Sequence, residues 1–139
     1  MAKVVFEKII KSDRKKVFEL ATNYENFQKI LPQYYPSIRT ISVRGNVSVV
    51  EEHLVIGGRE LVMMIKHVIN DPILHELFVI GGDAKGTHIT NRYEQLANGT
   101  KLILEVEWKI KGMMKITDLS GKKIADEYSK IVDKFIEMI

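Results

Sequence analysis

Residues 120–138 carry apolar side chains at the spacing of an α-helix. Ile124, Tyr128, Ile131 and Phe135 recur at intervals of three and four positions, and charged residues fill most of the positions between them. The pattern predicts one amphipathic helix of about 19 residues, which is roughly 28 Å long at a rise of about 1.5 Å per residue. A helix of this kind must bury its apolar stripe against the elements that precede it.

The middle of the chain, residues 38–111, shows the alternation and the turn residues of consecutive strands. Gly45-Asn46, Gly57-Gly58 and Asn98-Gly99 are pairs that suit tight two-residue hairpin turns. Together the alternation and the turns predict strands at residues 38–44, 47–56, 59–69, 73–80, 87–96 and 101–111.

The first part of the chain adds one strand and two short helices. Residues 3–11 are apolar and β-rich, which predicts a strand. Ser12 is the expected N-cap of a helix that ends near residue 23, and a second helix follows at about residues 24–31, before Pro32 and Pro36. We therefore expect an α+β fold in the order strand, two short helices, six strands and one long helix.

Composition adds several limits to this picture. The 139 residues suit a single domain, 1–139, and the hydrophobic content of 45% is ordinary for a globular protein. We find neither an apolar run long enough to span a membrane nor a signal peptide. The chain has no cysteine, which excludes disulfides and thiolate sites and fits a cytoplasmic location. A formal net charge of +3 is too small to favour nucleic-acid binding.

The last predicted strand indicates which side chains face inward, because successive strand residues point to opposite faces. Its apolar face consists of Leu102, Leu104, Val106, Trp108 and Ile110. A two-residue turn at Asn98-Gly99 gives the cross-strand pairs Tyr93 with Leu104, Asn91 with Val106, and Ile89 with Trp108. The same inner face should therefore carry Ile89, Asn91 and Tyr93.

The other two hairpins extend this assignment. A turn at Gly57-Gly58 gives the pairs Leu54 with Leu61, Glu52 with Met63, Val50 with Ile65, and Ser48 with His67. A turn at Gly45-Asn46 gives the pairs Val43 with Ser48, Ile41 with Val50, and Arg39 with Glu52. Arg39, Glu52 and His67 should then face the long helix, although a β-bulge would reverse part of the assignment. For residues 73–80 either His75 or Glu76 could point inward.

The run SDRKKVFELATNYENFQKILP after the first strand, the entry into the strands at residues 36–44 and the C-terminal amphipathic helix resemble the Bet v 1-like helix-grip superfamily. This superfamily includes START domains and single-domain proteins of the polyketide cyclase/dehydrase and coenzyme Q-binding type. The resemblance covers nearly the whole chain. It implies a seven-stranded antiparallel sheet wrapped around the last helix, with an apolar cavity between them. The motifs are signatures of fold and carry no catalytic residue.

Arg39, Glu52 and His67 form a polar set near Asn91 and Tyr93 in this projection. One hypothesis is a polar grip on a ligand, with His67 or Glu52 as an acid or base. The alternative is a purely structural role, in which Arg39 and Glu52 form an ion pair and His67 is buried with its hydrogen bonds made inside the protein.

The full set of residues expected to line the cavity is Arg39, Ile41, Glu52, Met63, Ile65, His67, Ile89, Asn91, Tyr93, Val106, Trp108, Tyr128, Ile131 and Phe135. The four histidines lack the spacing of metal ligands, so we expect no metal and no cofactor.

The leading hypothesis is a non-enzymatic binding or carrier protein for an apolar small molecule such as a lipid, an isoprenoid, a quinone-like molecule or an aromatic. The first alternative is an enzyme of the polyketide cyclase or aromatase type, with Arg39, Glu52, His67 or Tyr93 handling protons. The second is a START-like regulatory module that binds a protein or the ribosome. The sequence leaves the ligand, the oligomeric state and the presence of catalysis open.

Overall fold

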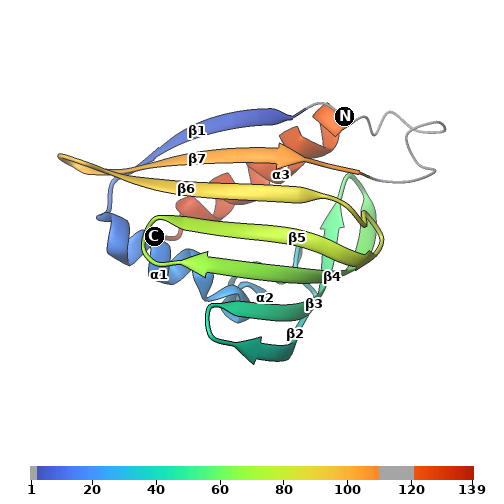
Figure 1. Ribbon diagram of the computed structural model, residues 1–139. Coiled ribbons are helices and arrows are strands. Elements are labelled where there is room, and N and C mark those ends of the chain that lie inside the picture. Colours follow the sequence, from blue (N-terminus) through green and yellow to red (C-terminus); the bar gives the residue numbers. More distant parts are fainter. Residues whose placement is uncertain (1–2, 110–120) are drawn as a thin grey trace.

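The computed structural model describes residues 3–109 and 121–139, with the side chains of residues 121 and 122 excepted. One antiparallel sheet of seven strands curves around a C-terminal helix (Figure 1). The strands are β1 (Val4–Ile10), β2 (Ser37–Arg44), β3 (Val47–Ile56), β4 (Arg59–Asn70), β5 (Leu74–Gly82), β6 (His88–Leu96) and β7 (Gly99–Glu107). The helices are α1 (Arg14–Thr22), the 3-10 turn η1 (Tyr24–Asn26), α2 (Phe27–Ile30) and α3 (Gly121–Ile136). The predicted element order is confirmed.

The strands follow the order β1-β7-β6-β5-β4-β3-β2, so β1 and β2 form the two edges of the sheet. The α1–η1–α2 segment links these edges across the mouth of the curve (Figure 1). Side-chain hydrogen bonds attach it to the sheet, from the backbone nitrogen of Ile38 to Gln28 Oε1 at 3.1 Å and from Thr40 Oγ1 to Glu25 Oε2 at 2.9 Å. Helix α3 packs on the concave face, where Lys8 Nζ of β1 donates to Ser129 Oγ and Asp133 Oδ1, both at 2.7 Å.

Helix α1 begins one residue later than the Ser12 cap predicts. Asp13 is the N-cap, and its carboxylate accepts the backbone N–H of Lys16 at 3.0 Å. The carbonyl of Ser12 instead accepts a hydrogen bond from Thr100 Oγ1 at 2.7 Å. Ser12 therefore serves the junction with β7, and the aspartate provides the cap.

The register of the β3–β4 hairpin is confirmed, since Glu52 pairs with Met63 and Ser48 with His67. The β6–β7 register is wrong by two residues, because Leu96 pairs with Gly99 and Tyr93 pairs with Leu102. Gly99 lies inside the ladder where a Cβ atom would come 2.2 Å from the carbonyl oxygen of Ile10. The close approach of β1 thus requires glycine at this position, and the turn consists of residues 97 and 98. A shift of two residues leaves the inner face unchanged.

The expectation that Arg39 and Ile41 face the helix is wrong. A β-bulge between Thr40 and Ser42 changes the β2–β3 register, so that Ile38 pairs with Glu52 and Thr40 with Val50. Arg39 points outward and forms an ion pair with Glu51 at 3.4 Å, while Ile41 is 46% exposed. The extra residue of the bulge reverses the alternation for the rest of β2.

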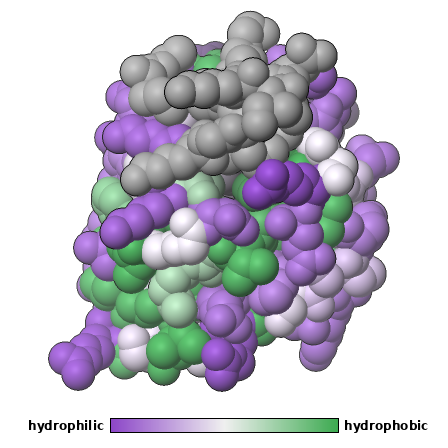
Figure 2. Space-filling model, turned by 90° about the vertical axis from the view of Figure 1, so that its right-hand side faces the viewer, coloured by the Kyte–Doolittle hydropathy of each residue, from purple (hydrophilic) through white to green (hydrophobic). Residues whose placement is uncertain are grey.

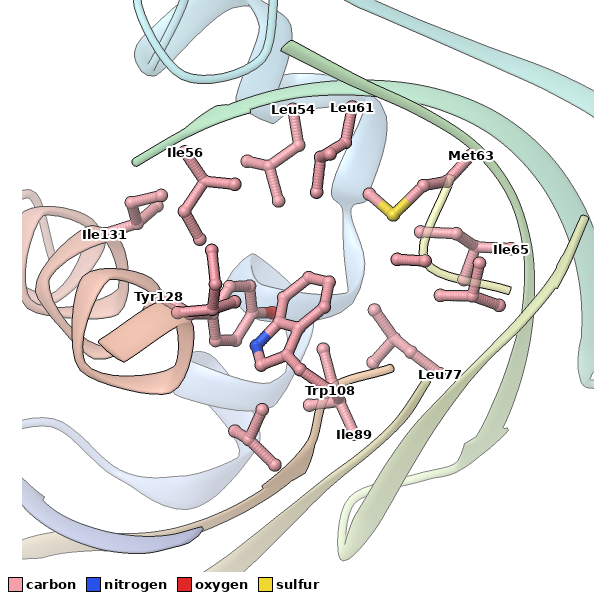
Figure 3. Packing of buried hydrophobic residues seen from close by; sticks show 14 of the residues in the cluster. Leu54, Ile56, Leu61, Met63, Ile65, Leu77, Ile89, Trp108, Tyr128 and Ile131 are labelled. Carbon is pink, nitrogen blue, oxygen red and sulfur yellow. The ribbon is translucent and has the colours of Figure 1, made fainter. Parts of the chain in front are cut away.

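A core of buried side chains fills the space between the sheet and α3. Figure 3 shows Leu54, Met63 and Ile89 pointing from the strands toward Tyr128 and Ile131 of α3. The predicted apolar face of the last strand is confirmed, because Leu102, Leu104 and Val106 of β7 are buried, as is Trp108 directly after it. Ile110 lies outside the described residues.

The surface mixes hydrophobic and hydrophilic residues, as the face in Figure 2 shows. Exposed apolar side chains on the strands include Ile41, Val43 and Ile80. They are scattered along the outer face and edges of the sheet and take no part in the interior described below.

Candidate functional site

A small cavity lies inside the curve of the sheet, beneath α1, α2 and α3. Its volume is about 60 Å³. Its apolar wall includes Phe27, Leu31, Leu77, Ile131 and Phe135. A buried water needs roughly 10–15 Å³ on this measure, so the cavity has room for a few waters or a very small molecule. A larger ligand requires part of the wall to move.

A second void of about 10 Å³ continues the interior past Tyr35, Glu52, Leu77 and Tyr128, which line both spaces. Trp108 lines this smaller void, with its ring edge-on to Tyr128 at a centroid distance of 5.8 Å. Figure 3 shows the indole nitrogen turned toward α3. Within the described part of the chain, this Nε1 is the one buried side-chain nitrogen or oxygen without a hydrogen-bond partner.

The structure distributes the residues that were predicted from sequence to line a cavity over three places. Glu52, His67, Asn91, Tyr93, Tyr128, Ile131 and Phe135 line the larger cavity. Met63, Ile65, Ile89 and Trp108 line the smaller void. Val106 is buried in the core and lines neither space, and Arg39 and Ile41 lie on the outside.

The polar wall of the cavity is a chain of three buried side chains, Glu52, His67 and His75. Glu52 Oε2 lies 2.5 Å from His67 Nε2, and His67 Nδ1 lies 2.8 Å from His75 Nε2. The three residues are 4%, 1% and 4% exposed. They come from β3, β4 and β5, because the inner faces of these adjacent strands place them side by side. The ambiguity between His75 and Glu76 is thereby resolved, with His75 inside.

His75 stays neutral in this position. Its burial, and then the neighbouring His67, lower the pKa of His75 to about 3. A neutral imidazole carries one hydrogen and can either donate or accept at Nε2, depending on the tautomer. When His67 is neutral with its hydrogen on Nε2, His67 Nδ1 accepts from His75; when His67 carries both hydrogens, it donates to His75. The chain can therefore hold one more proton without leaving a nitrogen at the His67–His75 contact unpaired.

Three buried tyrosines line the same cavity. Burial raises the pKa of Tyr35, Tyr93 and Tyr128 well above the ordinary value, and the charge of Glu52 adds to this for Tyr35 and Tyr128. A side-chain hydrogen bond between Tyr35 and Tyr128 also acts on both groups, adding to the rise in the pKa of Tyr35 and opposing the rise at Tyr128.

Two further contacts hold the histidines in place. The ring of Tyr24, from η1, stacks on His67 at a centroid distance of 4.4 Å. Asn91 Nδ2 on β6 donates to the carbonyl oxygen of His75 at 3.3 Å. The polar wall is therefore supported from both the helical segment and the neighbouring strand.

Sequence reasoning missed His75, Tyr24 and Tyr35 as members of the site. The alternation of β5 offered His75 as one of two choices, and only the pairing with β4 selects it. Tyr24 and Tyr35 belong to η1 and to the loop after α2, whose placement on the sheet is a tertiary contact. The helical spacing of Tyr24 and Phe27 was the available signal that these aromatics share a face.

A larger hollow of about 690 Å³ lies outside, between α3 and the β3–β4 turn. Charged residues of α3, among them Glu127, Lys130, Asp133 and Lys134, line much of it. A space of this kind offers little water-excluded surface, so the interior cavity is the stronger candidate for a small-molecule site.

Metal binding finds no support in the part of the chain that the structure describes. Among residues 3–109 and 121–139, no group of three or more histidines and carboxylates has the geometry to hold an ion. Within the same residues, no helix is both long and apolar enough to cross a membrane.

Comparison with protein-family models finds no match, and comparison with curated protein sequences finds none either. Solved structures, by contrast, superpose over nearly the whole chain. TTHA0849 from Thermus thermophilus gives a TM-score of 0.84 at 16% identity, covering 98% of this chain and 95% of that one. Ginseng major latex-like protein 151 from Panax ginseng gives 0.77 at 14% identity, with coverage of 99% and 96%.

A third similar structure is the Zhui aromatase/cyclase from Streptomyces, with a TM-score of 0.71 at 11% identity and coverage of 98% and 89%. Likeness at these identities concerns the fold. Sheet order, helix placement and these superpositions agree that the chain has the Bet v 1-like helix-grip fold.

Proposed function

We propose that this protein binds a small molecule with an apolar or aromatic body and a polar oxygen, held between the sheet and α3. The observation that carries the proposal is the asymmetry of the interior cavity. Its helical wall is mainly apolar, and its sheet wall presents the Glu52–His67–His75 chain. Binding pockets for small molecules typically combine an apolar lining with a few converging polar groups.

The walls suggest how such a ligand enters. Phe27 of α2 contacts Phe135 of α3 and Tyr35, with ring centroids 5.1 Å and 5.5 Å apart. These aromatic contacts close the cavity between α2 and α3. An outward movement of η1 and α2 would separate them and enlarge the space for a lipid, isoprenoid, quinone-like or aromatic molecule.

A binding or carrier role is the first form of this proposal. The similarity to a protein named a major latex-like protein supports no particular ligand, and the similarity to a protein named an aromatase/cyclase keeps an enzyme as the second candidate. One observation favours the enzyme. The buried Glu52–His67–His75 chain is an acid–base group that a passive carrier does not need.

The test is mass spectrometry on protein purified gently from its own host, under native conditions and after solvent extraction. We expect a stoichiometric apolar molecule in the intact complex and its mass in the extract. Protein that is empty, and stays empty when offered quinones, fatty acids and small aromatics, would contradict the proposal. The hypothesis to test next would then be that the protein binds a macromolecule in a complex that salt weakens.

A further inference from the structure

We propose that the polar wall of this cavity catalyses proton transfer at the carbon next to a ketone carbonyl group, so that the substrate is an enolisable ketone with an apolar body. This inference rests on the proposed binding of a small molecule in the same cavity. It adds a reaction, a substrate class and separate roles for the two sides of the cavity.

The proton acceptor is Glu52. Its carboxylate lines the cavity, is 4% exposed, and uses Oε2 for its hydrogen bond with His67. A carboxylate offers two oxygens and about four lone-pair positions, so this bond leaves room to accept a proton from a substrate.

His67 and His75 act as positioning residues behind the base. The 2.5 Å and 2.8 Å contacts connect the Glu52 carboxylate to His67 and His67 to His75, and so restrict the orientation of all three side chains. Because His75 can reverse its role at Nε2, a proton that reaches Glu52 can be shared with His67 and remain hydrogen-bonded. A purely structural ion pair would need no second histidine able to switch between donor and acceptor.

The other side of the reaction is the oxygen of the substrate. Removing a proton next to a carbonyl group places negative charge on that oxygen, and a fixed hydrogen-bond donor in a dry site stabilises it. Tyr128 lines the same cavity, and its hydroxyl stays protonated because burial and the charge of Glu52 raise its pKa, so it can donate a hydrogen bond to the substrate oxygen.

The step balances without any cofactor. The carbon–hydrogen bond breaks, its proton moves to Glu52, and its electron pair forms the carbon–carbon double bond of an enolate that Tyr128 stabilises. The proton then returns to the same carbon, or to the far end of a conjugated system, where it shifts a double bond. Neither an oxidant nor a reductant is consumed.

The experiment follows the exchange of the hydrogens next to the carbonyl of cyclohexanone for deuterium in D₂O, by proton NMR. We compare the intact protein with Glu52→Gln, Tyr128→Phe and Glu76→Gln. Glu76→Gln is the matched control, because Glu76 forms a similar contact with His88 at 3.0 Å on the outer face of the sheet. Saturation-transfer NMR on the same samples measures binding, and circular dichroism checks folding.

We expect the wild-type protein and Glu76→Gln to exchange the ketone equally fast. Glu52→Gln should be slower by about 10²- to 10⁴-fold, the usual contribution of a general base. Tyr128→Phe should be slower by about 10²- to 10³-fold, the usual loss for one oxyanion donor.

The outcomes separate this inference from the proposed binding function. Cyclohexanone that binds without exchanging faster than in buffer overturns the inference alone. Exchange that is as fast in folded Glu52→Gln as in wild type also overturns it. A ketone that neither binds nor exchanges counts against both proposals. If Glu52→Gln fails to fold, the test uses the wild-type protein alone. The inference then predicts that the exchange rate saturates with ketone concentration and falls when menadione, a quinone, is added to occupy the cavity. An exchange rate that menadione does not change overturns the inference.

Discussion

Glu52 and Glu76 form similar contacts with a histidine on opposite faces of one sheet. Glu52 and His67 are almost fully buried, whereas the side chains of Glu76 and His88 are 25% and 36% exposed. Bulk water screens the outer pair far more than the inner one. The free energy of unfolding should therefore depend on the two glutamates to very different extents.

Replacing Glu52 by leucine should lower the free energy of unfolding by about 3–5 kcal/mol, because it leaves the buried His67 Nε2 without its partner. Glu76→Leu on the outer face should change it by no more than about 1 kcal/mol. Urea denaturation at pH 7 measures both variants. Equal losses would show that burial does not set the strength of these pairs.

Acid stability should depend on His75. In the unfolded chain this imidazole takes up a proton below its ordinary pKa of 6.5, whereas in the folded protein its pKa is about 3. The unfolded state thus binds more protons between these values, and the stability that His75 contributes is complete above pH 6.5 and is lost as pH falls toward 3. The slope should approach about 1.4 kcal/mol per pH unit.

Urea denaturation between pH 7 and pH 4 tests this, with His75→Gln as the comparison. Glutamine keeps a hydrogen-bonding group toward His67 and does not titrate, so the other groups contribute similarly in both proteins. The wild-type curve should fall more steeply below pH 6.5. Parallel curves would mean that His75 is protonated in the folded protein.

At the scale of elements, the cavity is defined by how η1 and α2 meet α3. Hydrogen bonds of Gln28 and Glu25 attach the α1–η1–α2 segment to the β2 edge of the sheet. A third attaches it to β6, where Gln95 Oε1 accepts a hydrogen bond from the backbone N–H of Arg14 at 3.0 Å. Toward α3 its contact includes the Phe27–Phe135 ring pair. The segment is thus hydrogen-bonded to the sheet, while aromatic packing joins it to α3.

Phe27→Ala should accelerate the entry of ligand into the cavity. An aromatic pair contributes about 0.5–1.5 kcal/mol, so losing the Phe27–Phe135 pair should raise the population of the open state, and with it the association rate, roughly 2- to 10-fold. Stopped-flow quenching of the single tryptophan, Trp108, by the quinone menadione measures the rate.

The control for this experiment is Phe78→Ala. Phe78 stacks on His88 at a centroid distance of 4.4 Å on the outer face, so its removal also costs an aromatic contact but leaves the cavity wall intact. Its association rate should match that of the wild type. An increase of the same size in both variants would place the entry route elsewhere.

At the scale of the whole molecule, the cavity links ligand binding to folding stability, because the cavity exists in the folded protein and not in the unfolded chain. A ligand that binds only the folded state stabilises it by mass action, by about 2.7 kcal/mol at a concentration of 100 times its Kd. Menadione should therefore raise the urea midpoint in a concentration-dependent manner.

Ala21→Leu provides the control, because Ala21 lines the cavity from α1 and the larger side chain occupies part of the space. The stabilisation by menadione should decrease in this variant, whatever its effect on the free protein. If menadione shifted the midpoints of both proteins equally, its binding site would lie outside the cavity.

The sequence by itself determined the elements, their order and most inner faces. Helical spacing marked α3, alternation marked the apolar face of β7, and Gly57-Gly58 set the β3–β4 register that places Glu52 near Met63 and His67 opposite Ser48. These features depend on neighbours a few residues apart, which turn chemistry and side-chain alternation control directly.

Only the tertiary structure decided the rest of the site. The bulge in β2 turned Arg39 away from Glu52. The polar partner of Glu52 inside the protein is instead His67, which in turn contacts His75. The approach of β1 to Gly99 moved the β6–β7 register. Each of these outcomes depends on contact between segments far apart in the chain, where the packing of a whole surface outweighs the preference of any local stretch.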